Sequence, residues 1–285
     1  MSFIIFYAKI KYAYKSTANC IEVKKARYNF MAKHMKNSKR MNFAILLFRI
    51  VSVIIIIICV YQLYNWYIEN KKNGDILEEI VSNYAQSTKQ IIIGEEEVSA
   101  LEVKIQDLIE KNGDTVGWLN VKGTKINYPV VKSNDNDYYL THSFDKSYNS
   151  AGWVFANYIN KFDGTDKNIS IFGHNRRDGS MFASLKDTIK EEWYKNEENY
   201  YITFETVNGT EIYKVFSNYK IKAETYYFTN DFKNNAEYKT FLDTLTSRSV
   251  YNYNTPVDTN SSIITLSTCA NDNTYRVVLH AVKVN

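Results

Sequence analysis

The longest apolar segment of the chain lies in its N-terminal quarter. Residues 50–68 contain no charged residue in 19 positions. At about 1.5 Å per residue, a helix of this length nearly spans a hydrocarbon core of roughly 30 Å, so the pattern predicts one transmembrane helix. A cleaved signal peptide is the competing interpretation. The run is long and no small-x-small cleavage site follows it, which favours an uncleaved signal-anchor.

The two flanks of this segment differ in charge. Basic residues precede it, namely Lys33, Lys36, Lys39, Arg40 and Arg49, and aromatic residues crowd its far end, namely Tyr61, Tyr64, Trp66 and Tyr67. The positive-inside rule then places the N-terminus in the cytoplasm and the C-terminal part outside. We therefore expect a single-pass protein of the cell membrane, with a basic cytosolic tail over residues 1–49. The alternative for the first 40 residues is an overlong translation start, since Met31, Met35 and Met41 lie closer to the helix.

Beyond the apolar segment, the pattern changes from helical to strand-like. Residues 75–82 and 95–111 carry apolar side chains at helical spacing and predict two helices in a membrane-proximal segment over residues 69–117. Short β-branched and aromatic runs follow and predict strands over residues 118–121, 126–131, 169–172, 200–206, 211–222, 263–267 and 275–284. So many short strands favour a β-barrel over residues 118–285.

Two helical insertions are expected between these strands. One covers residues 180–192, and the other covers residues 234–246, where Tyr238, Phe241, Leu242 and Leu245 share one face. The expected fold is therefore mainly β: a barrel with N-terminal helices and a helix in the late strand connection, preceded by one transmembrane helix.

Charge is divided unevenly along the 285 residues. Residues 1–69 carry 11 Lys or Arg against Glu22 and Glu69, a net charge of +9, and the remaining residues hold 24 basic and 29 acidic groups, a net charge of −5. A nucleic-acid-binding protein would concentrate basic residues on its folded domain, and here the opposite is found. The part after the anchor has the size of a single core.

Cysteine usage singles out one residue. Cys20 falls in the tail and Cys59 in the apolar segment, so Cys269 is the one cysteine expected outside and no disulfide can form there. Cys269 ends an apolar run, and Arg276 heads the next run seven residues later. A thiolate is the nucleophilic form of cysteine and is favoured by nearby positive charge, so this pattern predicts an active site. An inert buried cysteine is the structural alternative.

The sequence Thr265-Leu266-Ser267-Thr268-Cys269, the following Arg276 and His174 in an upstream Gly-His-Asn turn together resemble a sortase. The resemblance covers roughly residues 75–285. It implies a cysteine transpeptidase that cuts a C-terminal sorting signal of secreted proteins in Gram-positive bacteria and joins the freed carbonyl to a cell-wall amine. It also identifies Cys269, His174 and Arg276 as the catalytic residues.

The three residues divide the tasks that this chemistry needs. The resemblance implies that Cys269 attacks the carbonyl and holds the acyl group as a thioester, and that His174 transfers protons to and from the amines. Arg276 keeps its proton and serves as a partner of the oxyanion or of the substrate backbone. No metal or cofactor is required.

Three other histidines are candidates for the role of His174. His34 is excluded by topology. His280 shares a strand face with Val278 and Val282 and lies roughly 13 Å along the strand from Arg276, so we expect a packed structural residue. His142 is the serious alternative. His174 is favoured because it enters a loop directly after an apolar strand.

Substrate-binding candidates come from the resemblance and from position. A segment like residues 136–140 helps line the groove of class B sortases, which makes Asn136 and Leu140 candidates. Ser267 and Thr268 flank the nucleophile, where they can meet the peptide backbone. Tyr227, with Tyr226 and Phe228, is expected either to form an apolar wall of the groove or to pack in the barrel.

The N-terminal helices and the helix in the late connection resemble class B, and no second hydrophobic segment follows Arg276, as class C would require. Two departures affect the loop after the nucleophile. The Cys269 to Arg276 spacing is shorter than in some class B members, and Ala270 stands where an acidic residue is often found.

The resemblance thus implies a membrane-anchored class B transpeptidase. Its partners are secreted proteins with an Asn-Pro-x-Thr type signal, among them haem-acquisition proteins, and a peptidoglycan amine from lipid II or a cross-bridge. Two alternatives stay open: a membrane-tethered cysteine hydrolase that passes the acyl group to water, and a noncatalytic surface-binding module. Nucleic acid is not an expected partner.

Overall fold

The computed structural model describes residues 2–269 and 274–285, and the side chains of these residues except 2–21, 37–40, 86 and 269. The chain divides into two units, residues 1–65 and residues 66–285. The first helix, α1, covers Ser2–Tyr84 and contributes to both units. Within the described residues, it is the one helix long and apolar enough to cross a membrane.

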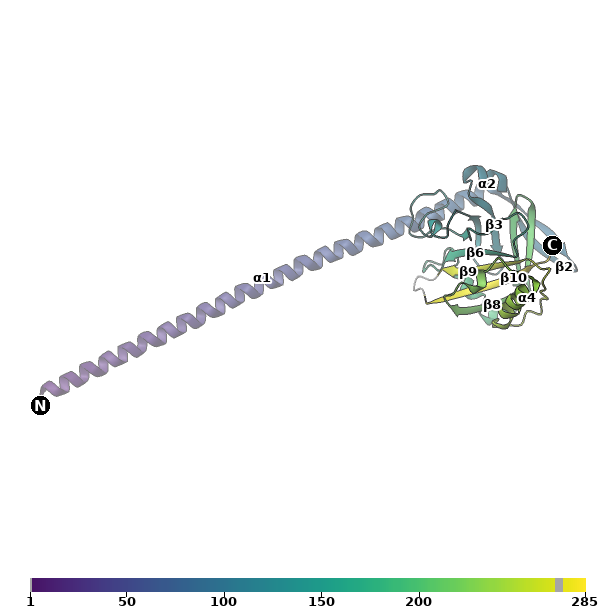
Figure 1. Cartoon of the computed structure of the whole chain (residues 1–285). Coiled ribbons are helices and arrows are strands. Elements are labelled where there is room, and N and C mark those ends of the chain that lie inside the picture. The colour runs from purple at the N-terminus through teal and green to yellow at the C-terminus, as the bar shows by residue number, and fades with distance from the viewer. Residues whose placement is uncertain (1, 270–273) are drawn as a thin grey trace. The chain divides into compact units, whose positions relative to one another are not determined.

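The second unit is built around a closed barrel (Figure 1). Its eight described strands follow the order β10-β8-β7-β3-β4-β5-β6-β9. In chain order they are β3 (Thr115–Val121), β4 (Asn127–Val131), β5 (Phe155–Ala156), β6 (Asn168–His174), β7 (Tyr201–Thr206), β8 (Gly209–Lys222), β9 (Ile263–Cys269) and β10 (Tyr275–Lys283). The pairs β4–β5 and β6–β9 are parallel and the others are antiparallel. The expected β-barrel is confirmed.

Strand alternation sends one set of side chains into the barrel and the other set outward. The interior holds large buried side chains, among them Trp118, Trp153, Phe204, Leu266 and Leu279. The last turns of α1 add Ile80, which is fully buried, so the helix expected over residues 75–82 is confirmed as part of α1.

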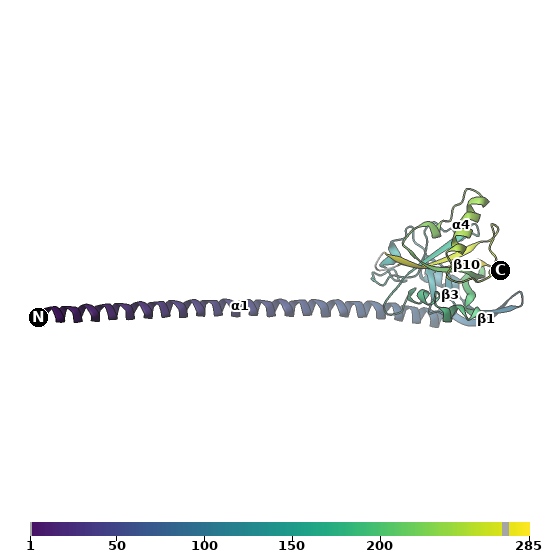
Figure 2. The same cartoon turned by 90° about the horizontal axis from the view of Figure 1, so that it is seen from below.

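Helix α4 (Asn235–Ser247) covers the outer face of the sheet beside β10 (Figure 2). Its buried face, formed by Tyr238, Phe241, Leu242 and Leu245, packs on Val278 and Val282. The Asn234 side chain accepts a hydrogen bond from Glu237 N at 2.9 Å and caps the first turn. The helix expected in the late connection is confirmed.

The helix expected over residues 95–111 is wrong for most of its length. The structure has a hairpin, β1 (Ala85–Ile93) and β2 (Glu96–Val103), and only then a short helix, α2 (Ile105–Lys111). Val98 and Ala100 are buried at a period of two, and Val98 packs on Tyr201 and Ile212. Gly94, with φ +63°, supplies the left-handed residue of the two-residue turn.

The regular helix expected over residues 180–192 is also wrong. This stretch holds a 3-10 helix, η2 (Ala183–Asp187), and one turn of α-helix, α3 (Glu191–Tyr194). Residues 181–185 are all buried, whereas an α-helix on the surface exposes one of its faces to solvent. Three further 3-10 turns are η1 (Tyr138–Leu140), η3 (Glu197–Tyr200) and η4 (Tyr226–Phe228).

Candidate active site

The barrel brings the ends of β6 and β9 together. These strands are parallel neighbours, and their register pairs His174 with Cys269 at the last position of each strand. Parallel neighbours lie about 4.8 Å apart across the sheet. The backbones of the two residues therefore meet at one edge, although 95 positions separate them in the sequence.

Strand β10 adds Arg276 to the same edge. Its antiparallel register with β9 pairs Val278 with Ser267. Continuing that register by two residues sets Arg276 beside the end of β9. Thr268 Oγ1 accepts a hydrogen bond from Val277 N at 3.0 Å, which joins β9 to β10 at this end.

His174 is half-buried and held by a backbone carbonyl. Its Nε2 lies 2.9 Å from Leu140 O. A carbonyl only accepts, so Nε2 carries the proton and Nδ1 is the basic nitrogen of the neutral ring. Burial lowers the pKa of His174, the hydrogen bond to Leu140 opposes this, and the nearby charge of Arg176 lowers it further. The neutral ring therefore predominates at neutral pH.

A groove of about 370 Å³ runs past this edge. Every substrate-binding candidate from the sequence lines it, together with Arg276: Asn136, Leu140, Tyr227, Ser267 and Thr268. The structure thus gathers residues from the η1 turn, the η4 turn and two strands into one depression.

Two aromatic side chains of this groove, Phe155 and Phe172, were not singled out as site residues by the sequence. Phe155, Phe172 and Phe228 line the groove, with ring centroids 5.6 Å apart for both the Phe155–Phe172 and the Phe172–Phe228 pairs. Phe172 precedes His174 by two positions and so shares its strand face, which is a signal the sequence contained. Phe155 lies in a two-residue strand with no recognisable pattern.

The polar candidates are held in defined orientations. The Asn136 amide donates to Asn157 Oδ1 at 3.1 Å and accepts from Tyr158 N at 3.1 Å. The Tyr227 hydroxyl lies 3.0 Å from Ser267 Oγ. Tyr227 is only 2% exposed, so it lines the groove and also packs against the barrel, combining the two expected alternatives.

The other two histidines of this unit are engaged elsewhere. His142 stacks on Tyr138 with ring centroids 4.0 Å apart, and its Nδ1 lies 2.7 Å from Tyr138 O. His280 is completely buried on the face that carries Val278 and Val282, as strand alternation predicted.

The side chains that the structure describes include no group of three or more His, Cys, Asp or Glu placed to hold a metal ion. The sequence departure at Ala270 lies outside the described residues.

Comparison with known proteins points to one family. The family model of the sortase domain matches residues 119–284. Sortase B of Listeria monocytogenes is 35% identical over 147 residues, which cover 50% of this chain and 58% of that protein. Sortase B of Staphylococcus aureus is 31% identical over 245 residues, which cover 85% of this chain and 97% of that protein.

Solved structures agree with the sequence comparisons. The crystal structure of sortase B from Bacillus anthracis in complex with AAEK1 is 29% identical, with a TM-score of 0.66 over 77% of this chain and 99% of that chain. A Staphylococcus aureus sortase B–substrate complex is 27% identical, with a TM-score of 0.65 over 76% of this chain and 99% of that chain.

Proposed function

Because the chain belongs to the sortase family of cysteine transpeptidases, we propose that Cys269, His174 and Arg276 carry out its reaction. The observation that most supports this assignment is the register that pairs His174 with Cys269 at the edge where Arg276 lines the groove.

The first half of the reaction is acylation. His174 Nδ1 takes the thiol proton, and the Cys269 sulfur attacks the scissile carbonyl carbon, forming a C–S bond and an oxyanion. The guanidinium of Arg276 stabilises that oxyanion. The intermediate collapses with cleavage of the C–N bond, and the protonated His174 gives its proton to the leaving amine.

The second half transfers the acyl group. An incoming amine attacks the thioester carbonyl, and His174 Nδ1 accepts the amine proton. The C–S bond then breaks, the new amide is released, and Cys269 recovers its proton. A water molecule attacking instead would give hydrolysis, so the supply of amine decides the product.

We assign the chain to class B, and the supporting observations are the sortase B relatives and the connection between β8 and β9 that carries α4. The donor we propose is a secreted protein with an Asn-Pro-x-Thr type signal near its C-terminus, and the acceptor is a peptidoglycan amine. The aromatic lining of the groove suits an extended peptide with apolar side chains, and Asn136 and Thr268 suit its polar groups.

The proposal includes the topology. Residues 1–49 form the cytosolic tail, residues 50–68 the transmembrane anchor, residues 69–117 the membrane-proximal segment and residues 118–285 the external catalytic barrel. The apolarity of α1 and the basic residues before its apolar stretch support this arrangement.

Mass spectrometry of the full chain in detergent tests the activity. Asn-Pro-x-Thr and Leu-Pro-x-Thr-Gly peptides are supplied with and without an amine, beside Cys269→Ala. We expect a thioester adduct and an amine-linked product that both require Cys269. Release of hydrolysed peptide alone, even with saturating amine, would identify a hydrolase, and peptide turnover by Cys269→Ala would refute the assigned nucleophile.

A further inference from the structure

Four side chains from four strands form a continuous buried chain of hydrogen bonds, which we call the polar chain. It consists of Tyr219 (β8), His280 (β10), Thr265 (β9) and Asn168 (β6). Tyr219 Oη lies 2.9 Å from His280 Nε2, His280 Nδ1 lies 2.9 Å from Thr265 Oγ1, and Thr265 Oγ1 lies 2.7 Å from Asn168 Oδ1. His280, Thr265 and Asn168 are all 0% exposed.

The acceptors at its end fix the direction of every bond. Asn168 Nδ2 faces two backbone carbonyls, Tyr227 O at 3.2 Å and Thr229 O at 3.0 Å. Carbonyls only accept, so the amide nitrogen faces them and Asn168 Oδ1 accepts from Thr265. Thr265 has a single proton to give, so it accepts from His280 Nδ1, and His280 Nε2 accepts from Tyr219. Burial lowers the pKa of His280 to about 3, so the ring keeps the neutral form that this direction needs.

The polar chain ends on the η4 turn, which forms one wall of the groove. Tyr227 and Phe228 of this turn line the groove, and Tyr227 also contacts Ser267 through its hydroxyl. A single 3-10 turn has little stability of its own, so its position depends on the contacts that hold it.

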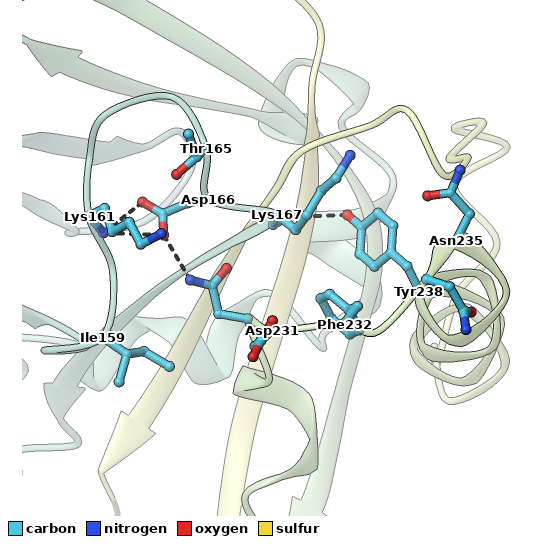
Figure 3. A pocket seen from close by; sticks show the side chains of 11 residues that line it. Ile159, Lys161, Thr165, Asp166, Lys167, Asp231, Phe232, Asn235 and Tyr238 are labelled. Carbon is cyan, nitrogen blue, oxygen red and sulfur yellow. Dashed lines mark hydrogen bonds between the residues drawn. The ribbon is translucent and has the colours of Figure 1, made fainter.

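A second set of contacts holds Asn230, two residues after Phe228, to the start of β6. Asn230 accepts from Asn168 N at 3.0 Å and donates to Asp166 Oδ1 at 2.8 Å. Asp166 and Tyr238 both line one pocket, where Asp166 also accepts a hydrogen bond from the backbone N–H of Lys161 (Figure 3). The backbone N–H of Phe162 donates to Asp166 as well. The start of β6 thus anchors both ends of the segment from Tyr227 to Asn230.

We propose that Asn168 is a positioning residue for substrate binding, which fixes Tyr227 and Phe228 as a preformed wall of the peptide groove. The inference rests on the proposed transpeptidase function. A wall that is already ordered before the peptide binds removes the free-energy cost of ordering it during binding. The effect is therefore expected on the affinity for the peptide more than on the rate of the chemical step. Among the described residues, Asn168 does not line the groove, and its side chain bonds to Thr265, Tyr227 O and Thr229 O rather than to His174 or Arg276.

Two isosteric variants of the full chain remove the anchor. Asn168→Asp keeps the acceptor for Thr265 but replaces the donor that faces the two carbonyls, and Thr265→Val removes the hydroxyl that orients Asn168. We expect each variant to raise the peptide KM about tenfold while kcat changes less than twofold. Thr265→Ser keeps the hydroxyl, so its KM should equal that of the wild type.

Hydrogen exchange of residues 223–232, measured by mass spectrometry without peptide, gives a second result that does not depend on turnover. The bonds Phe228 N to Thr225 O and Thr229 N to Tyr226 O should open more often in both variants. Thr115→Val is the matched control, because Thr115 is also buried, at 5% exposed, and donates to Asn112 O in another part of the barrel. It should change neither KM nor this exchange.

The outcomes separate the two proposals. Faster exchange of residues 223–232 together with a raised KM supports the positioning role. Unchanged exchange in both variants, or faster exchange with an unchanged KM, overturns it. Failure of the wild-type chain to process any peptide refutes the proposed function for those peptides, and the exchange comparison then still decides whether Asn168 holds the wall.

Discussion

Gly152 packs directly against the ring of His174. A Cβ added to Gly152 would lie 2.9 Å from His174 Cδ2, and 2.6 and 2.7 Å from the carbonyl oxygens of Tyr139 and Leu140. The φ angle of Gly152 is +61°, a conformation that favours glycine. The position of Leu140 O, which accepts the hydrogen bond from His174 Nε2, therefore requires a glycine at position 152.

We expect Gly152→Ala to lower kcat/KM about 10²-fold, because a backbone carbonyl cannot yield cheaply and the His174 ring must shift instead. The measurement is the rate of thioester formation on Cys269. Gly164→Ala is the matched control, since Gly164 has φ +85° but no heavy atom within 4 Å of its added Cβ. Equal losses in both variants would trace the effect to backbone strain rather than to the histidine.

The lowered pKa of His174 predicts the acid limb of the pH profile. His174 must be neutral to accept the thiol proton, so acylation should fall only below about pH 6.5, the usual value for histidine. Burial is the main cause of the lowered pKa, and the charge of Arg176 adds to it. Arg176→Gln should therefore move the limb to higher pH.

Arg176→Lys retains the charge and should leave the limb in place. The profile is measured as kcat/KM against pH with a reporter peptide. A limb that stays fixed in Arg176→Gln would show that another group controls it.

Removal of the Arg276 charge should slow the chemical step. We expect Arg276→Gln to lower kcat by about 10²–10³, the usual loss when one oxyanion-stabilising donor is removed, with a smaller change in peptide affinity. Arg276→Lys keeps the charge but not the planar fork and should recover only part of the rate. Single-turnover acylation checks this. A loss confined to KM would assign Arg276 to substrate binding alone.

The fold and the site differ in how far the sequence predicts them. Strands β6, β9 and β10 were predictable because their apolar, β-branched runs are long. The ends of those runs also indicated that His174, Cys269 and Arg276 lie near strand ends, as they do. Their catalytic roles came from the family resemblance and stay a prediction. The pairing of His174 with Cys269 depends on the register between two distant segments, which no local pattern encodes.

The errors have specific physical causes. Val98, Leu101, Ile105 and Leu108 fit a helical period, but the burial of Val98 and Ala100 against the barrel makes the first part a strand. Tertiary packing therefore overrode the local signal there. Phe155 and Gly152 escaped notice because their importance lies in contacts with residues far away in the sequence.

Acid should destabilise the barrel through His280. Burial lowers its pKa to about 3 in the folded state, against about 6.5 when unfolded, so the unfolded chain binds the extra proton first. The contribution of neutral His280 to the free energy of unfolding is complete above pH 6.5, and it is lost as the pH falls from 6.5 toward 3. At pH 4.5 the free energy of unfolding should have dropped by about 2–3 kcal/mol from this group alone.

His280→Asn removes this titration while keeping an amide that can donate to Thr265. We expect the variant to have a lower melting temperature than the wild type at pH 7.5. Its melting temperature should, however, fall less than that of the wild type between pH 7.5 and pH 4.5. The same substitution at the partly buried His142, which lies outside the polar chain, is the control for replacing a histidine. Thermal melts of the full chain at both pH values measure the difference. Parallel slopes for His280→Asn and wild type would mean that acid unfolds the barrel through other groups, and the polar chain would then tolerate a charged imidazole.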